Sequence, residues 1–278
     1  MTPIPSRSPT PNSLRTCTRS PMSHKQSVWL LGDNVSQSLS PAMQNAAFDA
    51  ANIDGRYVLR EVSRADLPNA IADLRADPDV LGANVTIPHK ESVIPLIDEL
   101  DPLAARLGAV NTIARTKTGL KGSNTDVEGF RRSLEVSGYR VDGRTVAIIG
   151  AGGAARAVAL ALGERVAHLS VIARNLAQAQ RLCLDLGLEP AIAVHSTLMR
   201  ETVIKADVVV NATPADLPPR DWLRPDQRLF DLRSRRSVEG RTMLLYQGAA
   251  SFEIWTGVKP SVEAMRAALD RAAQAVPA

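Results

Sequence analysis

The chain has 278 residues, 45% of them hydrophobic and 22% charged, which is a soluble composition with enough apolar side chains for one large domain or two compact ones. The net charge of +4 and the pI of about 9.3 come from mostly scattered basic residues without interleaved aromatic side chains, which disfavours a nucleic-acid-binding protein and favours an enzyme for anionic substrates. Two cysteines, Cys17 and Cys183, exclude a disulfide framework and fit a cytoplasmic protein, and no apolar run reaches the ~18 residues of a membrane span.

Residues 1–25 are rich in Ser, Thr and Pro and contain no acidic residue, so they predict a disordered tail rather than a targeting helix. An alternative is that translation starts at Met22. Between Val28 and residue 100 the hydrophobic period alternates between that of a strand and that of a helix, which indicates a parallel sheet. The predicted strands are Val28–Leu31, Tyr57–Val62 and Val80–Val85, and the predicted helices are Pro41–Ala51, Arg64–Ala76 and Pro88–Leu100.

A second alternating series begins after residue 140, and it predicts a second parallel sheet. Its strands are predicted at Thr145–Ile149, His168–Ala173, Val208–Asn211 and Arg228–Leu232. Its helices are predicted at Ala154–Leu162 and Leu176–Leu186, and a final Ala-rich helix at Val262–Val276. No internal repeat of solenoid period is present.

A glycine-rich turn of the form G-x-G-x-x-A connects the first strand and helix of this second series. Gly150 permits a tight turn, Gly152 lets the backbone approach a pyrophosphate, and Ala155 lets the helix pack on the strand. The free N–H groups at the start of the helix then attract the phosphates. The turn predicts a Rossmann-type dinucleotide site built from Gly150, Ala151, Gly152, Gly153 and Ala154, with a purely structural loop as the alternative.

The strand that follows ends in Ala173-Arg174-Asn175, without the acidic residue that binds the ribose of NAD. The guanidinium of Arg174 can bind the 2′-phosphate of NADP instead. We therefore expect NADP as the cofactor, with NAD tolerated. The alternative is a solvated arginine at a helix end.

Polar residues gather at strand-to-helix or strand-to-loop junctions before this turn, and side chains at the carboxyl ends of parallel strands converge on one cleft. Paired hydroxyls at Ser38 and Ser40 can hold a carboxylate, and Asn and Asp side chains can bond ring hydroxyls. Lys90 near Asp126 can act as an acid or base on an alcohol. Taken one by one, these motifs are ordinary helix caps and turns.

These motifs resemble those of the shikimate dehydrogenase family over nearly the whole chain after Val28. LGDNVSQSLSPAMQN, NVTIPHKE, GAVNTI, GSNTDVEG, GAGGAARA, VVNATP and QGAASFEIWTG follow in the family order. The resemblance implies that Lys90 and Asp126 are catalytic and that the substrate is bound by Ser38, Ser40, Thr86, Asn111, Asp126 and Gln247. It also implies that the cofactor contacts Thr213, Leu232 and Gly240, in addition to the glycine-rich turn and Arg174.

The sequence departs from the family pattern in five respects. Gln37 stands where a His is usual, and Gln178 stands where a second basic residue is common. Ser234 stands where the family has a substrate-contacting Tyr, and segment 232–240 is short by about a helix and a strand. The glycine usual just after NATP is also missing. Ser234 and the shortened segment bear on the identity of the substrate and on the catalytic rate rather than on the class of enzyme.

The expected architecture is α/β with two domains. Residues 26–125 are predicted to form a parallel-sheet substrate domain completed by helices at 248–278, and residues 126–247 a Rossmann-like NADP domain. The resemblance implies reversible NADP-dependent reduction of 3-dehydroshikimate to shikimate by a monomer or homodimer. The alternatives are a sibling dehydrogenase for quinate, aminoshikimate or another ring carboxylate, and a non-catalytic binding protein. Phe252 and Trp255 are expected in the core and His89 at the surface, and no metal site is predicted because His24, His168 and His195 lack ligand spacing.

Overall fold

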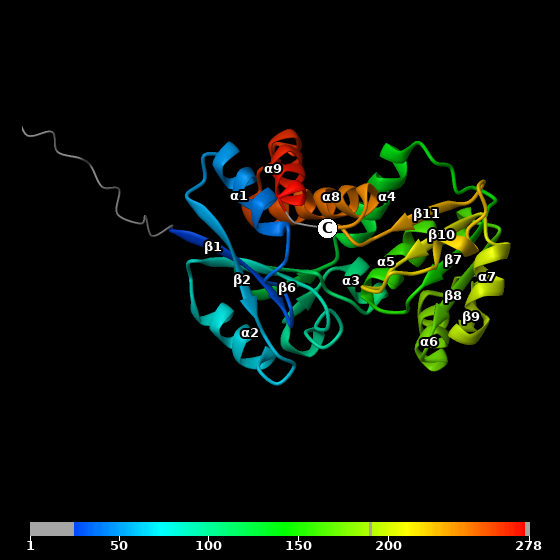
Figure 1. Cartoon of the computed structure of the whole chain (residues 1–278). Coiled ribbons are helices and arrows are strands. Elements are labelled where there is room, and N and C mark those ends of the chain that lie inside the picture. Colours follow the sequence, from blue (N-terminus) through cyan, green and yellow to red (C-terminus); the bar gives the residue numbers. More distant parts are fainter. Residues whose placement is uncertain (1–24, 189–190, 276–278) are drawn as a thin grey trace, which may run out of the picture.

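The computed structural model describes residues 25–188 and 191–275, which form two lobes, each built on one β-sheet (Figure 1). The predicted tail therefore lies outside the described residues, except for Lys25. Within the described part of the chain, no helix is long and apolar enough to cross a membrane.

The first sheet has six strands in the order β2-β1-β3-β5-β6-β4. β1 pairs in parallel with both β2 and β3, as the alternating pattern predicted, whereas β5 runs antiparallel between β3 and β6. The strands are β1 (Gln26–Gly32), β2 (Gly55–Glu61), β3 (Val80–Val85), β4 (Glu99–Leu100), β5 (Thr112–Thr116) and β6 (Gly119–Ser123). Helices α1 (Ser40–Ala50) and α2 (Leu67–Ala76) connect the parallel strands.

The helix predicted at Pro88–Leu100 is wrong. This segment forms turns, a short 3-10 helix at Ile94–Leu96 and the strand β4. Pro95 lies in the middle of the segment, where it removes a backbone donor and clashes with the preceding turn of an α-helix. Helix α3 (Pro102–Leu107) starts only afterwards, where Asp101 accepts a hydrogen bond from the Ala104 N–H at 2.6 Å.

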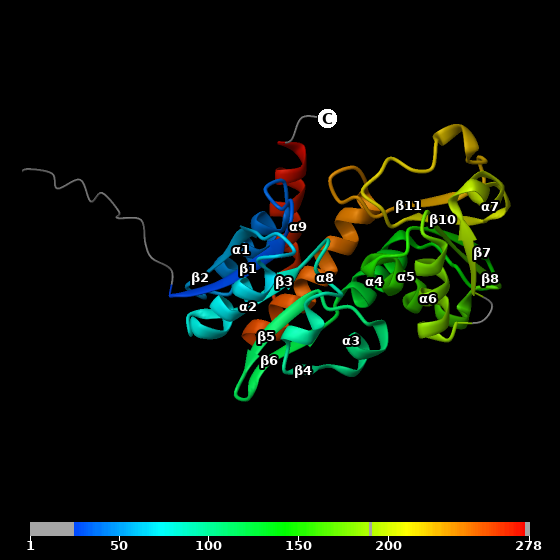
Figure 2. The same cartoon turned by 90° about the horizontal axis from the view of Figure 1, so that it is seen from below.

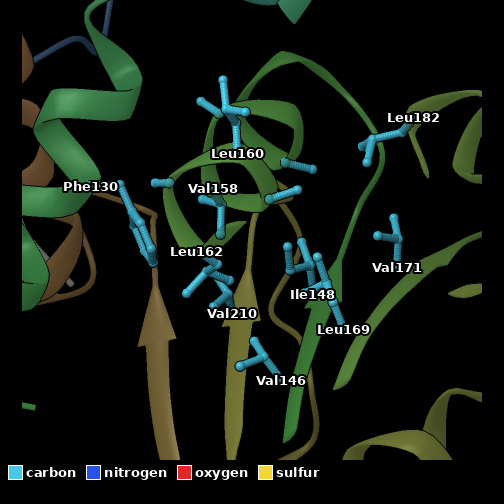
Figure 3. Packing of buried hydrophobic residues seen from close by; sticks show 14 of the residues in the cluster. Phe130, Val146, Ile148, Val158, Leu160, Leu162, Leu169, Val171, Leu182 and Val210 are labelled. Atoms are coloured by element: carbon cyan, nitrogen blue, oxygen red, sulfur yellow. The ribbon is translucent and has the colours of Figure 1, made fainter. Parts of the chain in front are cut away.

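The second sheet is parallel throughout, in the order β11-β10-β7-β8-β9. Aliphatic side chains of these strands and of α5 form its core, with Val146, Ile148, Val158 and Leu162 among them (Figure 3). The strands are β7 (Thr145–Ile149), β8 (His168–Ala173), β9 (Ala191–His195), β10 (Val208–Asn211) and β11 (Arg228–Asp231). The helices are α5 (Gly153–Leu162), α6 (Leu176–Leu186) and α7 (Met199–Lys205).

Two helices join the lobes: α4 (Asp126–Ser137) and α8 (Val238–Thr256), which pack against each other between the two sheets (Figures 1 and 2). A Cβ at Gly129 of α4 would lie only 2.8 Å from the Met243 carbonyl of α8, so glycine permits this close crossing. The last helix, α9 (Val262–Gln274), packs on α1.

The end of α8 completes the core of the first lobe. The rings of Phe252 and Phe48 meet edge to face at 5.0 Å between centroids, and Trp255 packs against Tyr57. Phe252 and Trp255 are thus core residues, as expected. The predicted domain boundary at residues 247 and 248 falls inside α8, so this one helix serves both lobes.

Candidate active site

The strand directions bring the predicted polar residues to one edge of the first sheet. Two antiparallel pairings follow in succession, so β6 runs in the same direction as β3, and both strands end at the same edge. Thr112 pairs with both Asn84 and Ser123 in the register, which places the residues after β3, before β5 and after β6 next to one another. Asn111 and Asp126 meet there as a result.

Lys90 and Asp126 form an ion pair at this edge. The ammonium Nζ lies 2.5 Å from Asp126 Oδ2, and the two side chains are 15% and 7% exposed. The Lys90 carbonyl accepts from the Val110 N–H at 2.7 Å, which fixes the loop that carries the lysine. Asp126 begins α4, where the free N–H groups of the first turn favour a carboxylate. The pair can hold a proton beside a bound alcohol or ketone.

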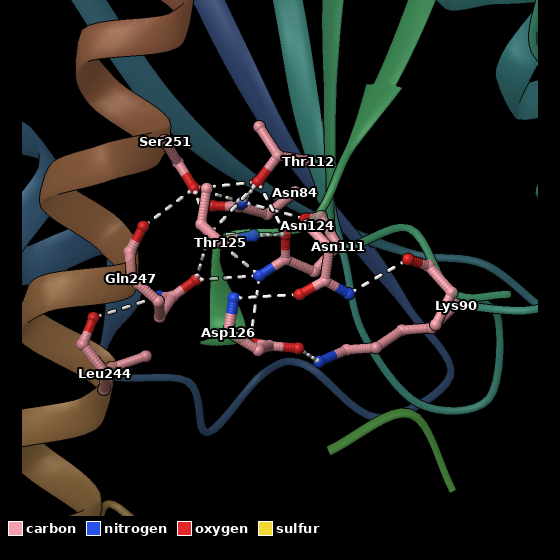
Figure 4. A network of polar contacts seen from close by, with 11 residues as sticks. Asn84, Lys90, Asn111, Thr112, Asn124, Thr125, Asp126, Leu244, Gln247 and Ser251 are labelled. Carbon is pink, nitrogen blue, oxygen red and sulfur yellow. Dashed lines mark hydrogen bonds and ion pairs between the residues drawn. The ribbon is translucent and has the colours of Figure 1, made fainter. Parts of the chain in front are cut away.

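Asn111 connects this ion pair to a wider network of side chains (Figure 4). Its Nδ2 donates to Asp126 Oδ1 and to Thr125 Oγ1, both at 2.9 Å, and lies 3.3 Å from Gln247 Oε1. Its Oδ1 accepts from the Thr125 N–H at 2.8 Å. The network therefore fixes the orientation of the Asp126 carboxylate and ties it to α8 through Gln247.

Tyr57 and Ser251, which were not predicted as site residues, extend this network through Asn84 of the NVTIPHKE motif. The Tyr57 hydroxyl donates to Asn84 Oδ1 at 2.8 Å, and Asn84 Nδ2 donates to Ser251 Oγ at 3.1 Å. Burial raises the pKa of Tyr57 well above its usual range, although a hydrogen bond with Ser40 lowers it, so the phenol stays a donor. Tyr57 and Ser251 lie within a strand and a helix, where a polar side chain at one position gives no signal of a site.

A pocket of about 380 Å³ opens above the ion pair. All seven residues predicted to act on or bind the substrate line it: Ser38, Ser40, Thr86, Lys90, Asn111, Asp126 and Gln247. Ala154, Leu232 and Gly240, which were predicted to contact the cofactor, line it as well. The pocket thus brings residues of both lobes together.

The glycine-rich turn follows β7 as predicted, and each of its glycines has a different environment. Gly150 has φ +115°, and a Cβ there would lie 3.0 Å from Thr213 Cγ2, so both backbone and packing require glycine. A Cβ at Gly153 would lie 2.9 Å from Lys90 Cδ, so this glycine leaves room for the lysine. None of the described residues comes within 4 Å of a Cβ at Gly152, whose φ of −87° suits any residue.

The remaining predicted cofactor residues follow other strands of the second sheet. Arg174 comes directly after β8, is exposed, and makes no hydrogen bond or ion pair with a described residue. Thr213 follows β10 and donates from Oγ1 to Asn211 Oδ1 at 2.8 Å. A Cβ at Gly240 would lie 2.8 Å from backbone atoms of Leu232, Arg233 and Ser234, so this glycine lets α8 begin against the loop after β11.

His89 is fully buried, contrary to the expectation that it lies at the surface. Its Nε2 lies 2.6 Å from the Val62 carbonyl oxygen, so the side chain is part of the first lobe. The surface position was expected because His89, although next to Lys90, is not part of the family pattern, whereas its contact with the Val62 carbonyl belongs to the buried interior.

A parallel sheet with a glycine-rich turn, beside a polar pocket that holds an ion-paired lysine, defines a two-lobed α/β dehydrogenase. Three family models match the chain in sequence order: the shikimate dehydrogenase substrate binding domain at residues 30–113, shikimate/quinate 5-dehydrogenase at 133–220, and the shikimate 5′-dehydrogenase C-terminal domain at 240–269. The chain belongs to the shikimate dehydrogenase family.

Individual relatives agree with this assignment. The shikimate dehydrogenase (NADP(+)) of Moorella thermoacetica is 44% identical over 268 residues, covering 86% of this chain and 90% of the relative. Shikimate 5-dehydrogenase of Thermus thermophilus, solved with NADP(H) and shikimate, superposes with a TM-score of 0.75 at 31% identity, covering 89% and 99% of the two chains. Quinate dehydrogenase of Corynebacterium glutamicum, solved with NAD, superposes with a TM-score of 0.77 at 30% identity, with the same coverage.

Proposed function

We propose that this protein catalyses the reversible NADP-dependent reduction of 3-dehydroshikimate to shikimate. The observation that carries the proposal is the Lys90–Asp126 pair, held by amide and hydroxyl side chains in a pocket that also reaches the glycine-rich turn. Relatives of 35–44% identity that carry the name shikimate dehydrogenase (NADP(+)) support the substrate and the cofactor.

The pocket residues divide into three groups by their chemistry. Lys90 gives a proton to the ketone oxygen during reduction and accepts it during oxidation, while Asp126 orients the ammonium and contacts a ring hydroxyl. The hydroxyls of Ser38 and Ser40 hold the carboxylate of the ring. Thr86, Asn111 and Gln247 bond the remaining ring hydroxyls.

The second lobe fits NADP. No described atom would contact a Cβ at Gly152, so packing within the protein does not explain the glycine. A pyrophosphate lying against the start of α5 would explain it, because it would occupy this space. The exposed guanidinium of Arg174 at the same edge of the sheet is free to bind the 2′-phosphate. NADP, when bound, supplies or accepts the hydride. The other residues proposed to contact it are Gly150, Ala151, Gly153, Ala154, Thr213, Leu232 and Gly240.

We also propose residues 26–125 with 248–278 as the substrate domain and 126–247 as the cofactor domain, in a cytoplasmic monomer or homodimer. The packing of α8 and α9 on the first lobe supports the return of the chain to the substrate domain. The cysteine usage supports the compartment.

A sibling activity on quinate is the second candidate, because quinate dehydrogenase of Corynebacterium glutamicum superposes as well as the shikimate enzymes. Ser40 favours shikimate, since quinate-using members of the family often carry Thr at this position, whereas Ser234 favours a sibling. A non-catalytic binding protein would need no buried Lys90–Asp126 pair.

The test is a panel of shikimate, quinate and other ring alcohols, each with NADP and NAD, read as nicotinamide absorbance. We expect the highest kcat/KM for shikimate with NADP. A higher kcat/KM for quinate would favour the sibling activity instead. If no ring alcohol were turned over, a non-catalytic binding protein would be the remaining candidate.

A further inference from the structure

Arg235 connects the two sides of the pocket. It lies in the loop between β11 and α8, and its Nη1 donates to the carbonyl of Gln37 at 3.0 Å and to Gln37 Oε1 at 2.5 Å. Gln37 lies 198 positions earlier in the chain and directly precedes Ser38 in the loop before α1. The guanidinium is therefore anchored at the serine end of the pocket, and both Arg235 and Gln37 line it.

The charge of Arg235 is not neutralised by any residue that the structure describes. Three charged residues line the pocket, and two of them, Lys90 and Asp126, neutralise each other. Arg235 has only the neutral Gln37 as a side-chain partner among the described residues, and its Nε and Nη2 make no hydrogen bond with any of them. The pocket thus carries one net positive charge, located at Arg235.

The neighbouring arginines differ from Arg235. Arg233 bonds the carboxylates of Asp231 and Asp216, at 2.5 and 2.6 Å, so its charge is paired. Arg236 is exposed and is not among the residues that line the pocket. Of the three, Arg235 alone combines an unpaired charge with a place in the pocket wall.

We propose that Arg235 is a specificity-determining residue that binds the carboxylate of the substrate, with Gln37 as the positioning residue that directs its guanidinium. The free Nε and Nη2 donors suit a planar carboxylate, which accepts two parallel hydrogen bonds from one guanidinium. Ser38 and Ser40 supply hydroxyls at the same end of the pocket. This inference rests on the proposed function, since it takes a ring carboxylate as the ligand.

The experiment compares Arg235→Ala with Arg236→Ala as the matched control, because both remove one arginine from the same loop. Dissociation constants for shikimate and for its uncharged methyl ester are measured by equilibrium titration, next to kcat and KM for shikimate with NADP. A charge-assisted hydrogen bond is worth about tenfold to a hundredfold in affinity. We expect Arg235→Ala to weaken the binding of shikimate by that factor and to raise its KM in parallel, while kcat stays within about threefold of the wild type. The dissociation constant of the ester should not change.

A smaller effect is expected for Gln37→Ala, since the Gln37 carbonyl still accepts from Arg235. Its KM for shikimate should rise by a few-fold, about the loss of one neutral hydrogen bond, at constant kcat. Arg236→Ala should match the wild type for both ligands.

Each other outcome overturns a specific statement. Equal losses of affinity for shikimate and its ester would show that Arg235 only holds the two sides of the pocket together. Unchanged binding of both ligands would show that Arg235 takes no part in binding. Either result overturns the inference, while shikimate turnover by the wild type upholds the proposed function. A wild type that binds shikimate in an Arg235-dependent manner without turning it over would refute the proposed function alone. A wild type that binds neither ligand would overturn both.

Discussion

At the scale of single residues, Arg174 is the residue that we propose sets the preference between NADP and NAD. It follows β8 directly, is exposed, and has no partner among residues 25–188 and 191–275, so its charge is available to a ligand. A single charge-assisted contact with a 2′-phosphate is worth roughly 1.5–3 kcal/mol. Because Gln178 offers no second charge nearby in the sequence, we expect the lower end of this range.

We predict that the wild type prefers NADP by about tenfold and still uses NAD, and that Arg174→Ala brings the two cofactors close to parity by weakening NADP. The measurement is kcat/KM for each cofactor. Raised ionic strength should reduce the preference of the wild type, because an exposed ion pair is screened. A preference of the wild type for NAD, or an unchanged ratio of kcat/KM between the two cofactors in the variant, would show that Arg174 is only a solvated residue at a helix end.

Gly152 gives the sharpest residue-scale test of the cofactor site. A Cβ added there meets no described atom within 4 Å and its backbone angles suit alanine, so the folded protein should tolerate it. We predict that Gly152→Ala leaves the free energy of unfolding within about 0.5 kcal/mol of the wild type. The dissociation constant of NADP should rise about tenfold or more, since the methyl occupies the space proposed for the pyrophosphate. An unchanged dissociation constant of NADP would show that the pyrophosphate does not lie against Gly152.

At the scale of elements, the crossing of helices α4 and α8 holds Gln247 next to the Asn111 network. The helices approach each other closely at Gly129, where a Cβ would lie 2.8 Å from both Gln247 Cβ and the Met243 carbonyl. We predict that Gly129→Ala lowers the free energy of unfolding by about 1–3 kcal/mol, the usual cost of overpacking. Urea denaturation measures this, with Gly152→Ala as the control that adds the same methyl in open space. Equal stability of both variants would show that the crossing relaxes without cost.

Parallel strands could be predicted from the sequence because each is a short apolar run between turn residues, as at Val80–Val85 and Thr145–Ile149. The β5–β6 hairpin could not, since Arg115, Lys121 and two threonines interrupt the apolar pattern of its strands, and its place beside β3 is set by a pairing distant in the sequence. Segment 88–100 shows the opposite error: apolar spacing indicated a helix, and Pro95 prevented one.

Site residues within sequence motifs could be predicted, and those outside them could not. Lys90, Asn111 and Asp126 stand at strand ends in recognisable clusters, and the strand directions bring them together. Tyr57, outside the motifs, joins the network from within a strand, and Ser251 joins it from a helix, where its place in QGAASFEIWTG did not mark it as a site residue. Arg235 reaches the pocket only because its loop folds against Gln37, a contact that no local pattern encodes.

At the scale of the whole molecule, the two sheets present the carboxyl ends of their parallel strands to a common space. The first lobe contributes the polar pocket and the second contributes the glycine-rich turn, which meets Lys90 at Gly153. Helices α4 and α8 join the lobes, so the ion pair and the turn lie next to each other in this structure. We propose that Lys90 transfers a proton in this space.

Lys90→Ala tests that claim most directly, with Lys121→Ala as the control because Lys121 pairs with Glu99 on the surface of the first lobe. The measurement is kcat for shikimate oxidation with saturating NADP, together with the dissociation constant of shikimate. Removal of a general acid or base should lower kcat by a factor on the order of 10²–10⁴ while shikimate binding stays within about tenfold, and the control should match the wild type. An unchanged kcat with a raised KM would contradict the account, because Lys90 would then only bind the substrate.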